Sequence, residues 1–278
     1  PQPATVQLTA RARRLLGEAQ ELVACLIRLA EEPLLASASE ASDVIDPLAI
    51  HYRETAAMLD SAVRLTQTFP DSASIQLRLC DGLDGMLAAV RQRLAALGHA
   101  IDIRRRDLEF ADRLAGLLVA LDAGRLDDQA GLAALAGDVL AEAAVAPLRW
   151  LYIRPDAERL HPSGAAYPAP ACFVACHSLT AARVMARVTR SSPEWQADPI
   201  TPVLATLIHD VGMLRTPVAA LMENGPLSET QLRAVEAHPR AGAELTAHGL
   251  PGLRALADPI AAHHGRMDGT GYPSGRKA

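Results

Sequence analysis

The chain has 278 residues, which is enough for one large or two ordinary domains. Half of its residues are hydrophobic and only 3% are aromatic, so a core built from Ala, Leu and Val favours packed helices over sheets. A net charge of −5 and the lack of a basic stripe argue against a nucleic acid partner. We expect no membrane span, because no apolar stretch reaches about 18 residues, and without a signal peptide we expect a cytoplasmic protein.

The first part of the chain, residues 1–105, reads as a region of long amphipathic helices. Apolar residues recur at helical spacing, and prolines and glycines separate the segments. We expect helices over about 9–32, 47–69 and 72–98 in this region, and two more over about 101–123 and 129–145 behind it. The region is either a sensor or dimerisation region, or a plain helical bundle, because periodicity does not separate the two. The helices could pair with each other or with those of a second chain as a homodimer.

The segment Leu148–Ile153 is the one convincing strand-like run. Its sequence predicts a short hairpin with residues 158–161, turned by Arg154-Pro155-Asp156. Residues 162–170 are rich in Pro, Gly and Ala and predict a loop. That loop either covers an active-site mouth or is a harmless insertion. From residue 171 onward the chain is expected to be helical again.

Three later helices are expected to present polar residues at their ends. The first begins with a cap at Thr201-Pro202 and is ended by Gly212; it is apolar nearly all round, so it should be buried, and it carries His209-Asp210. The second begins with a capping box at 228–231 and runs to His238-Pro239. The third is opened by Asp258-Pro259 and ends in His263-His264.

Histidines concentrate in this half of the chain, where six of the nine lie between residues 177 and 264. Neutral imidazole and carboxylate are ligands of iron, manganese and zinc. A lone histidine on an apolar face is more often a hydrogen-bonded core residue. Burying several histidines without partners, however, would cost on the order of several kcal/mol. The joint pattern therefore predicts a metal site, formed by His177, His209, Asp210, His238, His263 and His264. His248 lies outside this pattern and is expected at the surface.

The four cysteines are too sparse for a disulfide framework. Cys172 and Cys176 lie one helical turn apart beside His177, so they could contribute to a zinc site. We expect them instead to be buried structural residues.

The order of these elements resembles the HD-GYP family, a branch of the HD metal-dependent phosphohydrolases. That family has a first His on a helix, then an HD pair, an HP pair and a glycine-rich loop ending in GYP. Here the corresponding residues are His177, His209-Asp210, His238-Pro239 and the loop His263–Pro273. The resemblance implies an all-α protein, with an HD-superfamily helical domain over 106–278 behind the N-terminal helical bundle. We expect this domain to be truncated at its C-terminal end.

The resemblance also implies a mechanism and a ligand set. Two divalent metal ions, with iron or manganese expected, would be bridged by Asp210, and Asp210 and His209 would be the catalytic residues. The substrate would be cyclic di-GMP or a related nucleotide. In the loop, Arg266 could pair with a phosphate and Tyr272 could stack or hydrogen-bond, or both could make ordinary loop contacts. The full set of expected substrate-binding residues is Arg266, Asp268, Gly269, Gly271, Tyr272 and Arg215.

Three positions depart from the family pattern. Met213 stands where the family usually has Lys, with Arg215 as a weak substitute, and Gly265 stands where it has Glu. Phe173 occupies the place of a Glu found in members with three metals, which favours two metals here. A further Asp ligand normally follows the GYP motif; either it lies beyond Ala278 or the site lacks one ligand. Two hypotheses follow: a cyclic di-GMP phosphodiesterase, or a catalytically impaired module that binds nucleotide or a protein partner.

Overall fold

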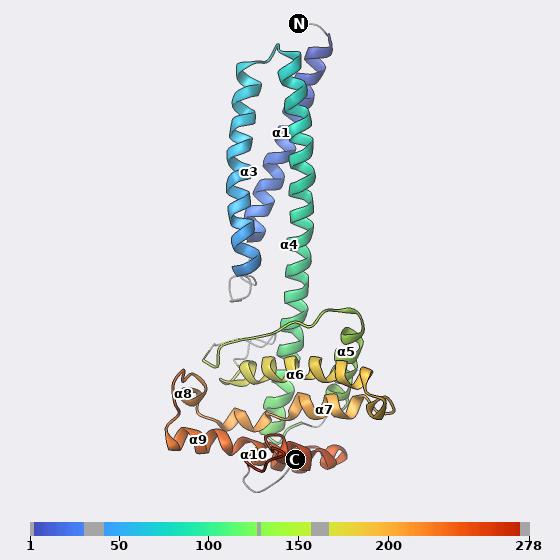
Figure 1. The fold of residues 1–278 in the computed structure, drawn as a ribbon, viewed down its shortest axis with the longest axis vertical. Helices are drawn as coiled ribbons and strands as arrows, with labels where there is room; N and C mark the ends of the chain where they lie inside the picture. The colour runs from blue at the N-terminus through green and yellow to red at the C-terminus, as the bar shows by residue number, and fades with distance from the viewer. Residues whose placement is uncertain (1–2, 31–41, 127–128, 157–166, 273–278) are drawn as a thin grey trace. The chain divides into compact units, whose positions relative to one another are not determined.

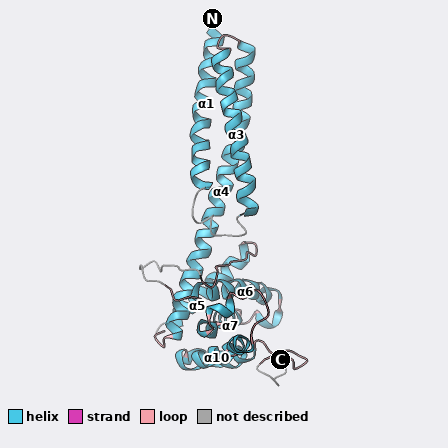
Figure 2. Ribbon diagram, turned by 90° about the vertical axis from the view of Figure 1, so that its left-hand side faces the viewer, coloured by secondary structure: helices cyan, strands magenta, loops and turns pink. Residues whose placement is uncertain are grey.

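The computed structural model describes residues 3–30, 42–126, 129–156 and 167–272 (Figure 1). All regular elements of these residues are helices, and none is a strand, which confirms the predicted all-α class (Figure 2). The chain divides into two compact units, Pro1–Arg106 and Asp107–Ala278. None of the described helices combines the length and the hydropathy that crossing a membrane requires.

The first unit is built from α1 (Pro3–Ala30), α3 (Ser42–Thr68) and the part of α4 (Ala73–Asp122) that precedes residue 107. Its core is aliphatic, as the composition predicts, and includes Ala12, Leu15, Leu59, Leu83 and Leu87. The turn from α3 to α4 is held by Gln76, whose buried side-chain amide donates to the carbonyl of Phe69 at 2.8 Å.

The helix α4 corrects the prediction of two separate helices with a break near Gly98. It continues through Gly98 to Asp122. Glycine inside a helix costs only about 1 kcal/mol relative to alanine. Burial of Leu97 (1% exposed) and Ile101 (5% exposed) on the same helix outweighs that cost.

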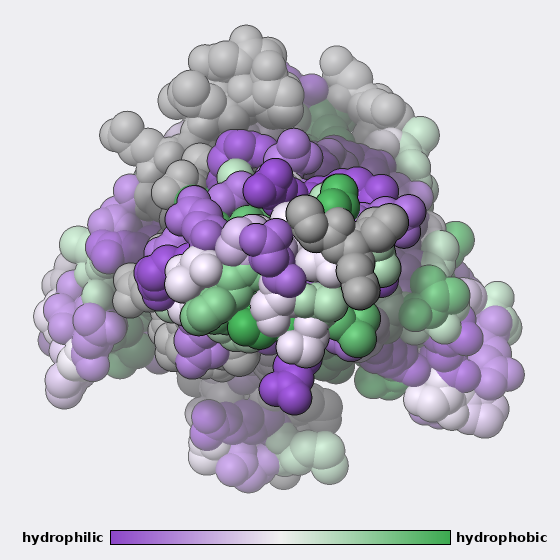
Figure 3. Space-filling model, turned by 90° about the horizontal axis from the view of Figure 1, so that it is seen from above, coloured by the Kyte–Doolittle hydropathy of each residue, from purple (hydrophilic) through white to green (hydrophobic). Residues whose placement is uncertain are grey.

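Several apolar side chains of the first unit face solvent. They include Val6, Met58, Leu65 and Phe69, each more than 40% exposed. Figure 3 looks onto the end of this unit where α3 passes to α4, and hydrophobic residues lie there among hydrophilic ones. Dimerisation through these helices stays a prediction.

The second unit begins with the last part of α4 and α5 (Gln129–Val145), followed by α6 (Ala171–Ser191) and α7 (Ile200–Ile208). The chain continues through η2 (Val211–Arg215), α8 (Val218–Leu221), α9 (Glu229–Glu236), α10 (His238–Gly249), η3 (Pro251–Leu256) and α11 (Ala257–Ala262); a short 3-10 turn, η1 (Pro193–Trp195), precedes α7. α6 and α7 lie side by side (Figure 1). Val203, Leu204, Leu207 and Ile208 are all buried, which confirms that α7 is central.

The predicted strand at 148–153 is wrong, because no described segment pairs with it. The chain there is extended, with alternating burial: Leu151 and Ile153 point inward while Trp150 and Tyr152 are exposed. Its partner is a helix, since the Leu151 N–H donates to the hydroxyl oxygen of Thr180 on α6 at 3.2 Å. The other half of the predicted hairpin, 158–161, lies outside the described residues, as does most of the loop 162–170.

Two predicted helix ends also need correction. α7 begins at Ile200 and follows Pro199, and the Asp198 carboxylate just before it accepts the N–H of Thr201 at 3.2 Å. It ends at Ile208, four residues before Gly212, because the chain tightens into η2. The capping box that opens α9 is confirmed: the Ser228 hydroxyl accepts the N–H of Gln231, and the Gln231 side chain accepts the N–H of Ser228.

A buried ion network joins α4, α5 and α6 within the second unit. The guanidinium of Arg183, 2% exposed, contacts Asp107 and donates to Glu142 at 2.9 Å. Arg149 donates to Asp107 at 2.9 Å and also contacts Glu142. Burial by itself would raise the pKa of Asp107, but the hydrogen bonds from Arg149 and Arg183 hold it below its ordinary value. The network fixes α6, the helix that carries His177.

Candidate metal centre

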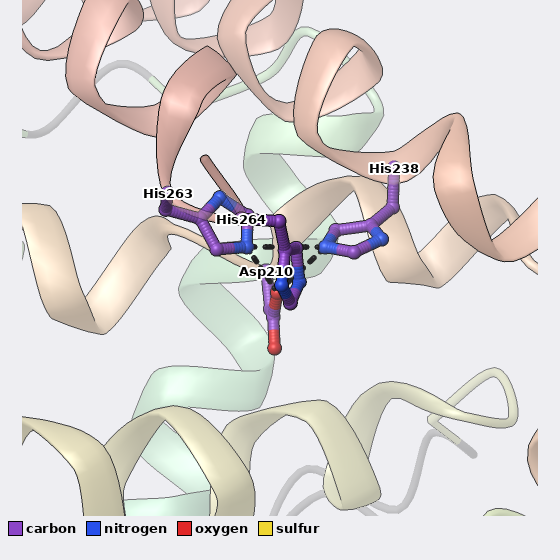
Figure 4. Close-up of side chains that lie close together, drawn as sticks. All are labelled: Asp210, His238, His263 and His264. Atoms are coloured by element: carbon purple, nitrogen blue, oxygen red, sulfur yellow. Dashed lines mark hydrogen bonds and ion pairs between the residues drawn. The ribbon is translucent and has the colours of Figure 1, made fainter. Parts of the chain in front are cut away.

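Five histidines and one aspartate from four helical elements meet in the second unit. His177 lies on α6, and His209 and Asp210 follow the last residue of α7. His238 is the first residue of α10, and His263 and His264 follow the last residue of α11. Helix ends therefore present five of the six side chains. In the close-up, the rings of His238, His263 and His264 surround Asp210 (Figure 4).

Two glycines allow the elements that carry these residues to approach closely. A Cβ added to Gly212 would lie 2.1 Å from the carbonyl oxygen of His238. One added to Gly242 would lie 3.3 Å from the carbonyl oxygen of His209. η2 and α10 thus cross backbone to backbone, which brings His238 against Asp210. Gly212 is thus a packing residue rather than only a helix end, and this role has no signal in the sequence.

Asp210 is the centre of the cluster, with an 11% exposed side chain. Its Oδ1 lies 3.1 Å from Nε2 of His238 and 3.4 Å from Nε2 of His263. Its Oδ2 lies 3.2 Å from Nε2 of His209 and 3.3 Å from Nε2 of His177. The two carboxylate oxygens therefore face different pairs of imidazoles.

The backbone determines which nitrogen of three rings faces Asp210. Nδ1 of His209 lies 2.8 Å from the carbonyl of Thr206, Nδ1 of His238 lies 2.5 Å from that of Val235, and Nδ1 of His263 lies 2.7 Å from that of Ile260. A carbonyl oxygen only accepts, so each Nδ1 carries the proton. The neutral rings then direct the Nε2 lone pair inward, as a metal-ligating histidine does.

This arrangement fits a metal better than it fits an ordinary polar cluster. Nε2 of His238 and Nε2 of His263 lie 3.2 Å apart, and in the neutral rings both atoms are acceptors. Two facing lone pairs repel each other unless a cation or a proton lies between them. Asp210 Oδ1 is also buried and lacks a hydrogen-bond partner of acceptable geometry among the described residues. A divalent cation would satisfy all of these atoms at once.

The six residues form two groups, each with ligand atoms within 4.8 Å of one another. The first group is Asp210, His238, His263 and His264, and the second is His177, His209 and Asp210. Asp210 is the one member that both groups share.

Electrostatics keep the carboxylate charged and His264 neutral. Burial alone would raise the pKa of Asp210, but contacts with His209, His238 and His263 hold it well below its ordinary value. Burial, together with repulsion from neighbouring histidines, lowers the pKa of His264 to about 4. Burial also lowers the pKa of His177. For His209 burial acts in the same direction, but the hydrogen bond and charge of Asp210 outweigh it and raise its pKa.

The glycine-rich loop after α11 supports the cluster from one side. Gly269 has φ of 79°, a conformation that favours glycine, and its N–H donates to the carbonyl of Arg266. The Asp268 carboxylate accepts the backbone N–H of Thr270 at 2.9 Å and its hydroxyl at 2.7 Å. A Cβ added to Gly271 would lie 2.2 Å from the carbonyl of His264. Asp268 and the two glycines therefore shape the loop.

Tyr272 contacts the cluster directly. Its ring stacks on His264, with centroids 4.5 Å apart and planes at 23°. We expected Tyr272 at the substrate end of the site; the structure places it against a candidate ligand. Arg266 is exposed on the loop, and Pro273 lies outside the described residues.

Arg215 has a different environment from the cluster. Its guanidinium donates to Asp122 at 2.7 Å and lines a pocket with Glu244 and His248 that includes none of the six cluster residues. Its role toward a substrate stays a prediction. His248 is exposed, as expected.

Met213, at the place of the family's Lys, is half-buried in η2 and its sulfur lies 3.7 Å from the Thr216 hydroxyl. Cys172 and Cys176 are buried and belong to neither group of candidate ligands.

The backbone carbonyls that orient the histidines could not be found from residue types. Their only signal is position: each lies three residues before a histidine at or beside a helix end.

An all-helical unit that gathers imidazoles around one aspartate defines a candidate metal-binding helical domain. The sequence model of the HD domain family matches residues 163–278. The match indicates an HD domain in this part of the chain, in keeping with the resemblance to HD-GYP proteins.

Curated relatives support this assignment over part of their length. The chain is 38% identical over 103 residues, 37% of its length, to the 3'3'-cGAMP-specific phosphodiesterase 3 of Vibrio cholerae, and covers 22% of that protein. It is 36% identical over 72 residues, 26% of its length, to a cyclic di-GMP phosphodiesterase of Pseudomonas aeruginosa, and covers 17% of it. The chain thus spans about a fifth of the length of the curated relatives it matches. No solved structure gave a significant match.

Proposed function

We propose that this chain is a metal-dependent phosphodiesterase that hydrolyses a cyclic dinucleotide, with cyclic di-GMP as substrate. One observation carries the proposal: two groups of candidate ligands meet at a single shared carboxylate, Asp210. Such an arrangement suits two adjacent divalent ions bridged by one aspartate. The names of the relatives, which include cyclic di-GMP and 3'3'-cGAMP phosphodiesterases, support the substrate class.

The candidate ligands fall into two sets, one for each of two metal positions. His238, His263 and His264 would hold one ion through one oxygen of Asp210, and His177 and His209 would hold the other through the second oxygen. Imidazole and carboxylate ligands suit iron or manganese. When bound, two such ions supply an activated water and neutralise the charge of the phosphate.

The chain's own residues contribute orientation and charge. Carbonyl acceptors hold His209, His238 and His263 in one tautomer, so their ligand atoms need no reorganisation. Arg266, exposed on the loop beside His264, is the cation we assign to a substrate phosphate. Tyr272 keeps the His264 ring in place by stacking on it.

One observation favours the alternative, a catalytically impaired module that binds nucleotide or a protein partner. The first turn after Asp210 carries Met213 rather than a cation, and the Met213 N–H donates to the Asp210 carbonyl. An electrostatic contact to the phosphate is therefore missing from that position.

The two functions are separated by metal analysis combined with a product assay. The protein is loaded with Mn²⁺ or Fe²⁺, its metal content is measured by inductively coupled plasma mass spectrometry, and cyclic di-GMP is added. Linear dinucleotide or mononucleotide in the wild type, absent in Asp210→Asn, supports the enzyme. Two bound metals and bound nucleotide without product support the module.

A further inference from the structure

Two aromatic side chains near the candidate metal centre, Tyr152 and Phe173, are not among its candidate ligands. Aromatic residues make up only 3% of this chain. Tyr152 is nevertheless 56% exposed, although large rings usually gain by burial. Its ring meets that of Phe173 edge to face, with centroids 6.2 Å apart and planes at 89°.

Tyr152 is held firmly in this exposed position. Its neighbours Leu151 and Ile153 are 5% and 9% exposed, and the Leu151 N–H donates to Thr180 on α6. The extended segment therefore contacts α6, and the alternation of buried and exposed residues leaves Tyr152 on its outer side. A ring fixed by its buried neighbours loses little entropy when it binds a ligand.

Phe173 connects this pair to the metal centre. It lies four residues before His177 on α6, so both side chains occupy one face of the helix about one turn apart. Helical side chains lean toward the N-terminus, so the His177 ring leans toward the turn of Phe173. His177 is itself 56% exposed, and its Nε2 lies 3.3 Å from Asp210 Oδ2. Phe173, and Tyr152 in contact with it, therefore lie about one helical turn from the exposed ligand His177.

We propose that Tyr152 and Phe173 form a stacking platform for a purine base of the cyclic dinucleotide whose phosphate lies at the metal centre. This inference rests on the proposed function. Exposed aromatic faces bind nucleobases through stacking, and a purine offers the larger face. The platform contributes no charge or ligand, so it acts on affinity for the base and leaves the metal ions in place.

The chain offers a matched control for the test. Trp150 is 66% exposed and belongs to the same extended segment, two residues before Tyr152, where the alternation turns it outward as well. No contact of Trp150 with Phe173 is seen among the described residues. Tyr152→Ala should weaken binding, Tyr152→Phe should retain it, and Trp150→Ala should change it little.

The experiment measures the dissociation constant of cyclic di-GMP on the full, metal-loaded chain, together with KM, kcat and metal content. Loss of one stacked base should raise Kd and KM of Tyr152→Ala by about 5- to 150-fold. kcat and metal content should stay close to the wild type. Inorganic phosphate, which has no base, is the second probe, and its affinity should be equal in wild type and variant.

Each outcome decides a different point. If the wild type hydrolyses cyclic di-GMP and Tyr152→Ala has an unchanged KM, the platform is wrong and the proposed function stands. If the wild type binds without hydrolysis and Tyr152→Ala binds more weakly, the platform stands and the hydrolysis is wrong. An equal loss of phosphate affinity would mean that Tyr152 acts through the metal centre, which overturns the platform. A wild type that does not bind the dinucleotide overturns both.

Discussion

His238 and His263 face each other through Nε2 atoms 3.2 Å apart, while each ring donates its Nδ1 proton to a backbone carbonyl three residues earlier. This pairing of two acceptors is unfavourable without a cation, and it comes from residues 25 positions apart in the chain. The relationship supports the assignment of the cluster as a candidate metal site, and it leads to predictions that are specific to single residues.

The two groups of ligands predict different metal contents for different variants. His264→Ala should reduce the metal content from two ions per chain to about one, because His264 belongs to only one group. Asp210→Asn should remove both ions and lower the apparent melting temperature, since bound metal stabilises the folded state. Mass spectrometric metal analysis after dialysis measures both. Equal metal contents in the two variants would contradict the shared role of Asp210.

Gly212→Ala should disrupt the site without touching any ligand. The new Cβ would lie 2.1 Å from the His238 carbonyl, so η2 and α10 must move apart. We expect a loss of metal affinity and a destabilisation of about 1–3 kcal/mol. Gly137→Ala on α5 is the control: nothing lies within 4 Å of its Cβ, and the change should stabilise the helix by about 0.5–1 kcal/mol. Similar effects of the two variants would exclude the proposed role of Gly212.

Metal affinity should depend on pH mainly through His209. Its pKa is raised, so below that value a proton on the ring competes with metal, and affinity should fall as pH decreases through the raised pKa. The pKa of His264 is about 4, so this ring is already neutral near neutral pH and does not contribute to the pH dependence of metal affinity there. Titrations with Mn²⁺ at several pH values should show that metal affinity depends less on pH in His209→Gln, and that this dependence is unchanged in His264→Gln. The reverse order would refute the assignment.

The buried ion network predicts a large loss of stability when one cation is removed. Arg183→Met leaves Asp107 and Glu142 with Arg149 as their remaining described arginine partner, and breaking a buried pair costs about 3–5 kcal/mol. Arg113→Met removes an ion pair with Asp138 whose side chains are 45% and 48% exposed, so it should cost less than about 1 kcal/mol. Urea unfolding compares the two; a small loss for Arg183→Met would mean that the network contributes little.

Met213→Lys should raise turnover if the protein hydrolyses cyclic di-GMP. The side chain follows Asp210 by one turn of η2, and a charge at this place can stabilise the phosphate in the transition state. Electrostatic contacts of this kind are worth about 10²–10³ in rate. Met213→Gln is the uncharged control, and metal content should be unchanged in both. A lysine variant no faster than wild type would show that Met213 is not the limiting defect.

The sequence alone predicted those features that depend on neighbouring residues. Helical periodicity predicted the all-α class, and the capping box at Ser228 predicted the start of α9, because hydrogen bonds within four residues determine both. The apolar composition around the HD pair predicted that α7 is buried. The same order of motifs named the six residues that the structure brings together.

Tertiary packing decided the rest, since it depends on residues far apart in the chain. Gly98 looked like a helix end, but burial of its neighbours keeps α4 continuous. Leu148–Ile153 alternates as a strand does, yet its inward face packs against α6 rather than pairing with another strand. Only the fold sets the division of the histidines between the two oxygens of Asp210, and only the fold places Tyr152 beside Phe173. Sequence spacing carries no information on these contacts, because the direction of each side chain is determined by the packing of whole helices.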